Sequence, residues 1–350
     1  MLVEENKPLA SLTTLGIGGP ARWFVEARTE GDIYEAATWS RQKGIPLFVL
    51  GGGSNLLVAD TGFNGLVVHI ALKGIGVREP AEGSDGRLYE VAAGEDWDPF
   101  VQRAVEDDCA GLECLAGIPG TVGGTPVQNV GAYGQEVSTV IECVRVFDHH
   151  EQRIQEFSNA ECGFAYRHSR FNTSDKGCYI VTRVNYRLRT NGAPTLKYAD
   201  LQRAFPAGSQ PTLADVVDEV RRIRQSKGML LVDGDPDCRS AGSFFKNPVV
   251  SEVDVERVAA AAGSEPPRFP AGTGHPAMVK LPAAWLIENA GFTKGYGLGR
   301  AGISHKHTLA LVNRGGATAA EIVALADQIR FAVAARFSIE LQMEPVMLGF

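Results

Sequence analysis

Two glycine-rich stretches, each placed directly after an apolar run, constrain this chain more than any other feature. The first is Gly51-Gly52-Gly53-Ser54-Asn55, and the second extends from Gly117 to Thr125. Glycine has no Cβ, so its backbone can approach a ligand closely and adopt positive φ. Successive main-chain N–H groups then form a concave surface that suits phosphate oxygens. Two such loops, the second followed by polar residues at 128–134, predict a large phosphate-bearing cofactor held from both sides.

Composition excludes several classes of protein. Glycine accounts for 40 of the 350 residues without a collagen-like repeat, so we expect the excess in functional loops. The formal net charge of −7 argues against a nucleic-acid surface. No apolar run approaches the roughly 18 residues of a membrane span, and the N-terminus is too polar for a signal peptide. We therefore expect a cytoplasmic protein with no nucleic-acid or membrane partner.

Cysteine and histidine spacing points away from disulfides and metals. The six cysteines form no Cys-x-x-Cys pair, which favours reduced thiols in a cytosolic protein. His305 and His307 could face one side of a strand, as metal ligands do. No third ligand lies near them in the sequence, so we expect no metal site.

Periodicity predicts alternating strands and helices, which is typical of an α/β organisation. After a strand at 22–28, Thr29 and Asp32 form a capping-box pair, with Asp in place of the usual Glu or Gln. A helix should begin there and end at Gly44, and a short strand at 46–50 leads into the first glycine stretch. Further elements are expected as strands at 66–70, 88–92, 141–148, 153–157, 178–188 and 308–312, and as helices at 98–106, 212–224, 281–290 and after a capping box at 318–321.

The sequence contains neither of two common nucleotide-binding motifs, the Rossmann fingerprint and the Walker loop. The segment from Gly16 to Ala21 fits G-x-G-x-x-A, but it precedes a strand and opens no helix, so it is no Rossmann fingerprint. The dipeptide Gly-Lys never occurs, which excludes a Walker loop.

The basic end of the 212–224 helix, with Arg224 and then Lys227, has two interpretations. The charges either oppose the helix dipole or form an anion site.

Three further segments combine with the glycine stretches. Phe164–Phe171 places Arg167 beside aromatic residues, and Ala241–Pro248 presents Ser243 in Ala-Gly-Ser-Phe-Phe-Lys-Asn-Pro. The C-terminal segment carries Glu344 near the end of an expected strand over 339–349. Each segment alone has an ordinary explanation as a surface ion pair, a turn or a solvated carboxylate.

Together, and in this order, these segments closely resemble the UDP-N-acetylenolpyruvoylglucosamine reductase (UDP-N-acetylmuramate dehydrogenase) family of bacterial cell-wall precursor synthesis. The resemblance extends from Thr14 to Gly349. It implies an α+β fold, with an FAD-binding fold of the vanillyl-alcohol-oxidase/PCMH type in two subdomains and a C-terminal α/β substrate-binding domain. The implied boundaries are 1–72 with 331–350, then 73–228, and finally 229–330.

The resemblance also implies the cofactors and the reaction. FAD would be reduced by NADPH, and the flavin N5 would deliver hydride to C3 of the enolpyruvyl ether of a UDP-sugar. Arg167 would stabilise the resulting negative charge, Ser243 would protonate C2, and Glu344 would support both Arg167 and the substrate. The residues implied in FAD binding are Gly51, Gly52, Gly53, Ser54, Asn55, Gly117, Gly123, Gly124, Thr125, Gln128, Asn129, Ala132 and Tyr133.

For the substrate, the resemblance assigns Tyr198 to the longer form of the family, on a loop that covers the UDP diphosphate. It also assigns substrate contacts to Tyr166, Arg224, Lys227 and Asn247, which favours the anion site at the basic helix end. The chain departs from the family pattern at Thr13-Thr14, after Lys227 and at Leu341-Gln-Met-Glu344. Because strand alternation puts Glu340 on the same face as Glu344, Glu340 remains an alternative carboxylate.

Two other functions stay open at this point. One is another FAD oxidoreductase of the same superfamily that acts on a hydroxy acid or a sugar. The other is a non-catalytic UDP-sugar binder. We expect the protein to be a monomer.

Overall fold

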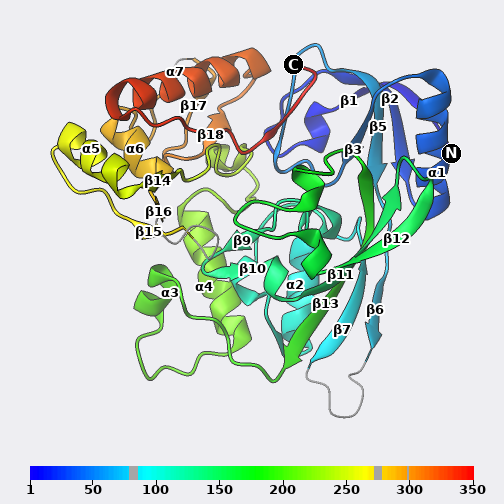
Figure 1. Cartoon of the computed structure of the whole chain (residues 1–350), viewed down its shortest axis with the longest axis horizontal. Helices are drawn as coiled ribbons and strands as arrows, with labels where there is room; N and C mark the ends of the chain where they lie inside the picture. Colours follow the sequence, from blue (N-terminus) through cyan, green and yellow to red (C-terminus); the bar gives the residue numbers. More distant parts are fainter. Residues whose placement is uncertain (79–85, 272–277, 298) are drawn as a thin grey trace. The chain divides into compact units, whose positions relative to one another are not determined.

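The computed structural model describes residues 1–78, 86–271, 278–297 and 299–350, which form two compact units (Figure 1). Unit 1 comprises residues 1–7, 21–53 and 64–226, and unit 2 comprises residues 8–20, 54–63 and 227–350. Each unit has its own apolar core. The first glycine stretch is divided between them, since Gly53 belongs to unit 1 and Ser54 to unit 2.

Helix α1 (Glu30–Lys43) of unit 1 begins and ends where the sequence predicts. The Thr29 hydroxyl accepts the Asp32 N–H at 3.1 Å, and the Asp32 carboxylate accepts the Thr29 N–H at 3.0 Å. This reciprocal capping box satisfies N–H groups that have no partner within the helix. Gly44, with φ of 64°, ends the helix in the left-handed conformation that glycine tolerates best.

Helix α1 connects two strands of a sheet with the order β1-β2-β5-β3. These strands are β1 (Glu4–Pro8), β2 (Pro20–Ala27), β3 (Leu47–Leu50) and β5 (Phe63–Ile70). Strand β3 pairs in parallel with β5, so that Leu47 lies opposite Leu66. The chain therefore enters the first glycine stretch at the carboxyl end of a parallel strand, where α/β sheets commonly bind ligands.

A second sheet in unit 1 has the order β12-β11-β13-β7-β6, and β8 also pairs with β13 (Figure 1). Its paired neighbours are antiparallel, with Val144 of β11 opposite Val184 of β13. The strands are β6 (Ile75–Arg78), β7 (Arg87–Ala92), β8 (Cys109–Ala110), β11 (Ile141–Asp148), β12 (Arg153–Ser158) and β13 (Tyr179–Thr190).

Two helices complete the core of unit 1. Helix α2 (Trp97–Glu106) contributes Trp97 and Phe100, and helix α4 (Leu213–Ser226) contributes Val216 and Val220. The rings of Phe100 and Tyr186 of β13 lie 5.2 Å apart, within the range of favourable aromatic contacts. The smaller elements are strands β9 (Gly131–Ala132) and β10 (Gln135–Glu136) and helix α3 (Ala199–Ala204).

Unit 2 contains three helices and several short strands in its described part. The helices are α5 (Glu252–Ala262), α6 (Ala283–Asn289) and α7 (Ala319–Phe337). Strand β4 (Leu56–Val58) pairs in parallel with β19 (Val346–Leu348). The other strands are β14 (Val249–Ser251), β15 (Phe269–Pro270), β16 (Met278–Lys280), β17 (Ala301–Ile303) and β18 (Leu311–Asn313).

The N-terminus of α7 is held by two sets of polar contacts. Thr318 and Glu321 form the expected capping box. The Asp60 carboxylate also accepts the N–H groups of Ala319 and Ala320 at 2.8 and 3.0 Å. A carboxylate at this position complements the positive end of the helix dipole. The segment 54–63 is thereby joined to the C-terminal part of unit 2.

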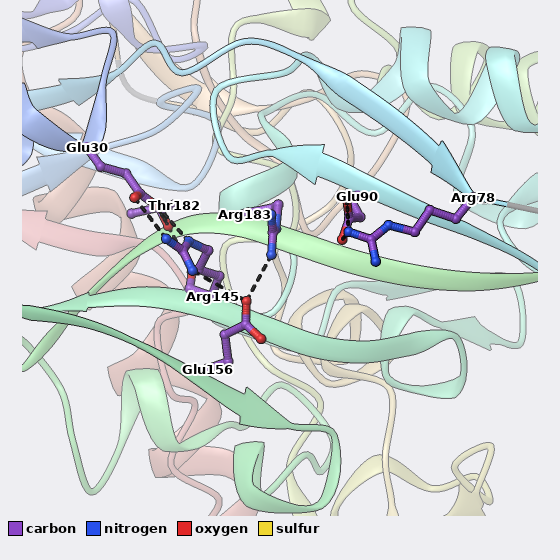
Figure 2. Close-up of polar contacts among 7 residues, drawn as sticks. All are labelled: Glu30, Arg78, Glu90, Arg145, Glu156, Thr182 and Arg183. Carbon is purple, nitrogen blue, oxygen red and sulfur yellow. Dashed lines mark hydrogen bonds and ion pairs between the residues drawn. The ribbon is translucent and has the colours of Figure 1, made fainter.

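Polar side chains join α1 to the second sheet of unit 1 (Figure 2). The Glu30 carboxylate accepts two hydrogen bonds from Arg145 of β11, at 2.8 and 3.1 Å, and one from the Thr182 hydroxyl of β13, at 2.9 Å. Nearby, Arg183 pairs with Glu156 at 2.9 Å. The Arg145 guanidinium lowers the pKa of Glu30. These contacts link the amino end of α1 to two strands distant in sequence.

Most expected elements are present, and two expected strands differ in their bounds. The strand expected at 308–312 begins later, as β18, because a turn closed by the Ala310 N–H and the His307 carbonyl precedes it. The C-terminal strand is confined to Val346–Leu348. Several short elements were not expected, among them β1, β4, β17 and α3. Residues 331–350 fall in unit 2 together with 227–330. The three-domain division stays a prediction.

None of the helices within the described ranges combines the length and apolar character needed to cross a membrane. All six cysteines, each in a described segment, are free thiols.

We expect Glu30→Gln to lower the free energy of unfolding by about 1 kcal/mol at about pH 7, a modest figure because the carboxylate is partly exposed to solvent. The folded-state pKa of Glu30 is lowered, so its stabilisation is present above the unfolded pKa and is lost as pH falls through the folded pKa. The difference between wild type and variant should therefore be smaller at about pH 2.5 than at about pH 7. Urea unfolding at both pH values measures this difference.

The matched control is Glu4→Gln, which removes an exposed carboxylate paired with Lys7 in the same unit. We expect a change below about 0.5 kcal/mol for this variant. Equal losses in the two variants would contradict a linking role for Glu30.

Candidate active site

The two glycine stretches contact each other within unit 1, where Gly51 and Gly52 of the first stretch carry no side chain. A Cβ built on Gly52 would lie 2.6 Å from the Gly120 Cα and 3.1 Å from the Thr121 nitrogen. A Cβ on Gly51 would lie 2.9 Å from the Thr121 hydroxyl oxygen. Any larger residue would force the loops apart. The structure thus brings together Gly51, Gly52 and the loop that runs from Gly117 to Thr125.

The surroundings of this contact fit a phosphate-bearing cofactor. The Thr121 hydroxyl is buried and has no hydrogen-bond partner among the described residues. Buried polar groups are nearly always paired, so an unpaired hydroxyl beside bare backbone fits an absent ligand oxygen. A Cβ on Gly124 would meet no atom within 4 Å, which leaves space beside the loop. These features fit the diphosphate of FAD, the cofactor that the resemblance implies.

The second loop is held along its length by the segment that leads into α2. The Gly123 N–H donates to the Ala93 carbonyl at 2.8 Å, and the Trp97 N–H donates to the Gly120 carbonyl at 3.0 Å. A Cβ on Gly123 would lie 2.6 Å from that of Ala93, so this glycine serves packing. The Thr125 and Tyr186 hydroxyls are 2.7 Å apart, which places Thr125 in the core.

The start of the same loop is held by residues that the sequence analysis did not single out. The Asp98 carboxylate accepts the Gly117 N–H at 2.6 Å and also pairs with Arg221 of α4. Arg224, predicted to contact substrate, is buried and donates its Nε–H to the Gly117 carbonyl at 3.1 Å. Burial lowers the pKa of Arg224. No local pattern could reveal the Asp98–Arg221 pair, because 123 positions separate its members.

Three predicted site residues share an unusual backbone conformation. Asn129, Tyr133 and Arg167 have φ values of 46°, 48° and 53°. Non-glycine residues rarely adopt positive φ, and such positions concentrate at functional sites. The Arg167 Nη2 donates to the Gly131 carbonyl at 2.9 Å, and the Asn129 amide donates to the Ala165 carbonyl at 3.0 Å. Arg167 is thereby held against the hairpin that carries Ala132 and Tyr133.

Other predicted residues gather near this hairpin. The rings of Tyr133 and Tyr198 lie 5.3 Å apart in an edge-to-face arrangement, and Tyr198 is 40 % exposed. Tyr166 lies beneath the Arg167 guanidinium, with 5.5 Å between the ring centre and Cζ. Gln128 is half-buried in the turn before Asn129.

A buried carboxylate that the sequence analysis missed supports the loop carrying Tyr198. Glu113 accepts the Thr195 N–H and the Gln135 side-chain amide, both at 2.8 Å. It joins the hairpin to the chain segment that precedes Tyr198. The sequence does hold a signal here, since Glu113 is a lone charge within an apolar run and a buried charge needs partners.

In unit 2, hydrogen bonds between two extended segments place Glu344 opposite Phe244, the residue after Ser243. The Glu344 N–H donates to the Phe244 carbonyl at 2.9 Å, and the Asn55 side-chain amide donates to the Glu344 carbonyl at 3.3 Å. Glu344 is half-buried, whereas Glu340 is exposed. The end of the first glycine stretch therefore lies next to the C-terminal segment.

Thr14 links the same parts of unit 2. Its hydroxyl lies 2.7 Å from the Ser240 carbonyl and 3.4 Å from the Ser54 carbonyl. A threonine hydroxyl at this position therefore bridges the first glycine stretch and the segment that leads to Ser243.

The remaining predicted substrate residues also lie in unit 2. The Asn247 side-chain oxygen accepts the Ala283 N–H at 2.9 Å and so holds the start of α6. Lys227 lies close enough to His307 to act on its charge: burial, Lys227 and Lys294 lower the pKa of His307 to about 4. No group of three or more metal-ligating side chains occurs among the described residues.

Family models match two regions of the chain. A model described as FAD binding domain matches residues 21–155, and one described as UDP-N-acetylenolpyruvoylglucosamine reductase, C-terminal domain, matches residues 235–348. The chain is 48 % identical over 354 residues to the UDP-N-acetylenolpyruvoylglucosamine reductase of Thermobifida fusca, covering 99 % of this chain and 98 % of that protein. This chain belongs to the UDP-N-acetylenolpyruvoylglucosamine reductase family.

Further members of the reductase family agree with this assignment. The enzyme of Streptomyces coelicolor is 46 % identical over 356 residues, covering 99 % of this chain and 90 % of its own length. The crystal structure of the reductase from Thermus caldophilus aligns with a TM-score of 0.67 at 28 % identity, covering 99 % of both chains.

Membership of the reductase family confirms the predicted FAD-binding fold, followed by the C-terminal domain of this family. The protein is an FAD-containing oxidoreductase. The sequence prediction of family and cofactor is therefore confirmed. The roles of individual site residues stay predictions.

We expect Gly52→Ala to lower the free energy of unfolding of the FAD-free chain by about 1–3 kcal/mol, because its methyl group would overlap Gly120. Gly124→Ala is the matched control in the neighbouring loop. Its methyl group meets no atom within 4 Å, so we expect a change below about 0.5 kcal/mol. Urea unfolding measures both variants, and equal losses would contradict the close approach of the loops.

Proposed function

We propose that this chain catalyses the NADPH-dependent reduction of the enolpyruvyl group of UDP-N-acetylglucosamine enolpyruvate to UDP-N-acetylmuramate, a step in peptidoglycan precursor synthesis. The observation that carries the proposal is the 48 % identity with the Thermobifida fusca reductase over 99 % of the chain. The substrate is accordingly a UDP-linked sugar. The monomeric state and cytoplasmic location stay predictions from the sequence.

FAD, when bound, supplies the redox chemistry by accepting hydride from NADPH and passing hydride to C3 of the enolpyruvyl group. The chain's own part is to bind and orient. We assign the diphosphate to the main-chain groups of Gly51–Asn55 and of the loop from Gly117 to Thr125. Gln128, Ala132 and Tyr133 are assigned to the ring system.

We assign Arg167 to the carboxylate of the enolpyruvyl group. Negative charge grows on this carboxylate when hydride arrives at C3, and a guanidinium held in place stabilises such charge without rearrangement. The hydrogen bond from Arg167 to the Gly131 carbonyl supports this role, because it restrains the side chain. The positive φ of 53° at Arg167 is the kind of backbone strain that persists where function needs it.

We assign Ser243 as the proton donor: its Oγ holds the proton that is transferred to C2. A serine hydroxyl is a weak acid. The C2 carbon becomes a strong base once hydride has reached C3, so a well-placed hydroxyl can protonate it. Glu344 is assigned to support the polarised substrate and Arg167. Its half-buried position on the segment paired with Phe244, compared with the exposed Glu340, supports Glu344 as the working carboxylate.

Four residues are assigned to the UDP-sugar. Tyr198, which is 40 % exposed, is proposed to cover the diphosphate, and Tyr166 lies beside Arg167. Lys227 is proposed to bind a diphosphate oxygen, which the nearby positive charge of Lys294 would favour. Asn247 uses its oxygen for Ala283, so its amide N–H groups are proposed for the uridine side.

Ser243→Ala should slow reoxidation of the reduced flavin by the enolpyruvyl substrate by about 10²–10⁴-fold, because the proton donor is removed. Reduction of the flavin by NADPH should be unchanged. Stopped-flow absorbance of the two half-reactions separates these steps. Ser264→Ala, at an exposed serine of the same unit, is the control. Normal reoxidation in Ser243→Ala would refute the proton-donor role.

Lys227→Ala should raise KM for the UDP-substrate about tenfold, the usual cost of one charge-assisted hydrogen bond. The flavin content of the purified protein should stay as in wild type. Steady-state NADPH oxidation at varied substrate concentration gives KM, with Lys176→Ala at an exposed position as control. An unaltered KM would remove Lys227 from the substrate site.

A further inference from the structure

Charged side chains hold the main chain of Gly117 at both its N–H group and its carbonyl group. On its nitrogen side, the Asp98 Oδ1 accepts the Gly117 N–H at 2.6 Å. On its carbonyl side, Arg224 donates its Nε–H at 3.1 Å. The second carboxylate oxygen of Asp98 accepts a hydrogen bond from Arg221. All these residues belong to unit 1.

These side chains come from two helices that are firmly packed. Arg221 and Arg224 lie one turn apart on α4, and residues with this spacing occupy the same helix face. The apolar face of α4 is buried in the core of unit 1 through Val216 and Val220. Asp98 is in the first turn of α2. The side chains therefore connect Gly117 to parts of the unit that cannot shift without disrupting the core.

The arrangement is costly unless it holds something in place. The Asp98 and Arg221 side chains are each only 28 % exposed, so their charges are largely removed from water. By contrast, Arg222, the next residue on α4, pairs with Glu219 on the same helix and is 71 % exposed. Gly117 itself has φ of 70°, a left-handed conformation that glycine adopts readily. Beyond it, the loop continues to the contact between Gly120 and Gly52.

We propose that Asp98 and Arg221 are positioning residues for the cofactor: through Gly117 they hold the second glycine stretch in the geometry that binds FAD. Arg224 completes the arrangement from the carbonyl side through its Nε–H, and its substrate contact stays a prediction. The inference rests on the assignment of this loop to FAD. It does not depend on the enolpyruvyl substrate.

A positioning role and a purely structural ion pair differ in what they affect. A structural pair contributes to folding stability and leaves the affinity of a folded chain for FAD unchanged. A positioning pair changes the environment and the affinity of the bound flavin even in a chain that stays folded. The test therefore compares FAD binding with stability in the same variants.

The principal variant is Arg221→Met, which keeps the aliphatic part of the side chain and removes the charge. Its matched control is Arg222→Met, one position away on the same helix. We expect the FAD Kd of Arg221→Met to rise about tenfold, the equivalent of one lost charge-assisted hydrogen bond, and that of Arg222→Met to equal wild type. FAD fluorescence on serial dilution of the full-length holoenzyme gives Kd.

Two further readouts separate positioning from stability. The visible absorption bands of bound FAD should shift in Arg221→Met and stay as in wild type in Arg222→Met. Arg221→Lys restores the charge with a less suitable geometry, so it should recover most of the lost affinity. An FAD Kd and spectrum equal to those of Arg222→Met, in a folded Arg221→Met chain, would overturn the proposal.

If Arg221→Met fails to fold, Asp98→Asn replaces it. This variant keeps an oxygen for the Gly117 N–H and loses the charge that holds Arg221, so an unchanged FAD Kd overturns the proposal equally. FAD affinity is measured without substrate. A wild-type holoenzyme that binds FAD but leaves the enolpyruvyl substrate unreduced would refute the proposed function alone.

Discussion

The close approach of two stretches of main chain is the constraint on which unit 1 depends. Gly51 and Gly52 leave the end of β3 and meet Gly120 and Thr121, with no room for a Cβ at the contact. Parallel pairing of β3 with β5 sets where the first stretch starts, and the segment leading into α2 sets the path of the second. The result is a close contact of bare backbone with a buried Thr121 hydroxyl beside it that has no hydrogen-bond partner among the described residues, which fits a ligand oxygen.

Unit 2 places its proposed reacting groups by a different means. Ser243 and Glu344 lie on neighbouring extended segments whose backbones are hydrogen-bonded to each other at Phe244. Backbone pairing depends little on side-chain identity. This explains how the chain can depart from the family pattern at Leu341-Gln-Met-Glu344 and still hold Glu344 opposite Phe244. The same geometry leaves Glu340 in solvent.

Buried or partly buried carboxylates mark the places where distant segments of unit 1 join. Glu30 ties α1 to β11 and β13, Asp98 ties α2 to α4 and Gly117, and Glu113 ties the Tyr133 hairpin to the chain before Tyr198. Each carboxylate has several hydrogen-bond donors around it. Replacing one partner leaves a charge without compensation, so these contacts specify the arrangement more than they add to net stability.

The sequence by itself determined the features that depend on local chemistry. The caps at Thr29 and Gly44 set the ends of α1, and alternation or helical spacing located most strands and helices. The glycine stretches and the Ala241–Pro248 octapeptide identified the family and its cofactor. Side-chain capping and periodicity act over a few residues, so these features can be read without a fold.

Only the tertiary structure decided which distant residues meet. The contact of Gly52 with Gly120, the pairing of Asp98 with Arg221, and the restriction of the C-terminal strand to Val346–Leu348 leave no local pattern. Arg224 shows the difference most clearly: its place at a basic helix end left two interpretations open, and only the fold shows that its Nε–H donates to the Gly117 carbonyl. Hydrogen-bond partners more than a hundred residues apart meet because whole helices and strands pack together, and that packing exists only in the folded chain.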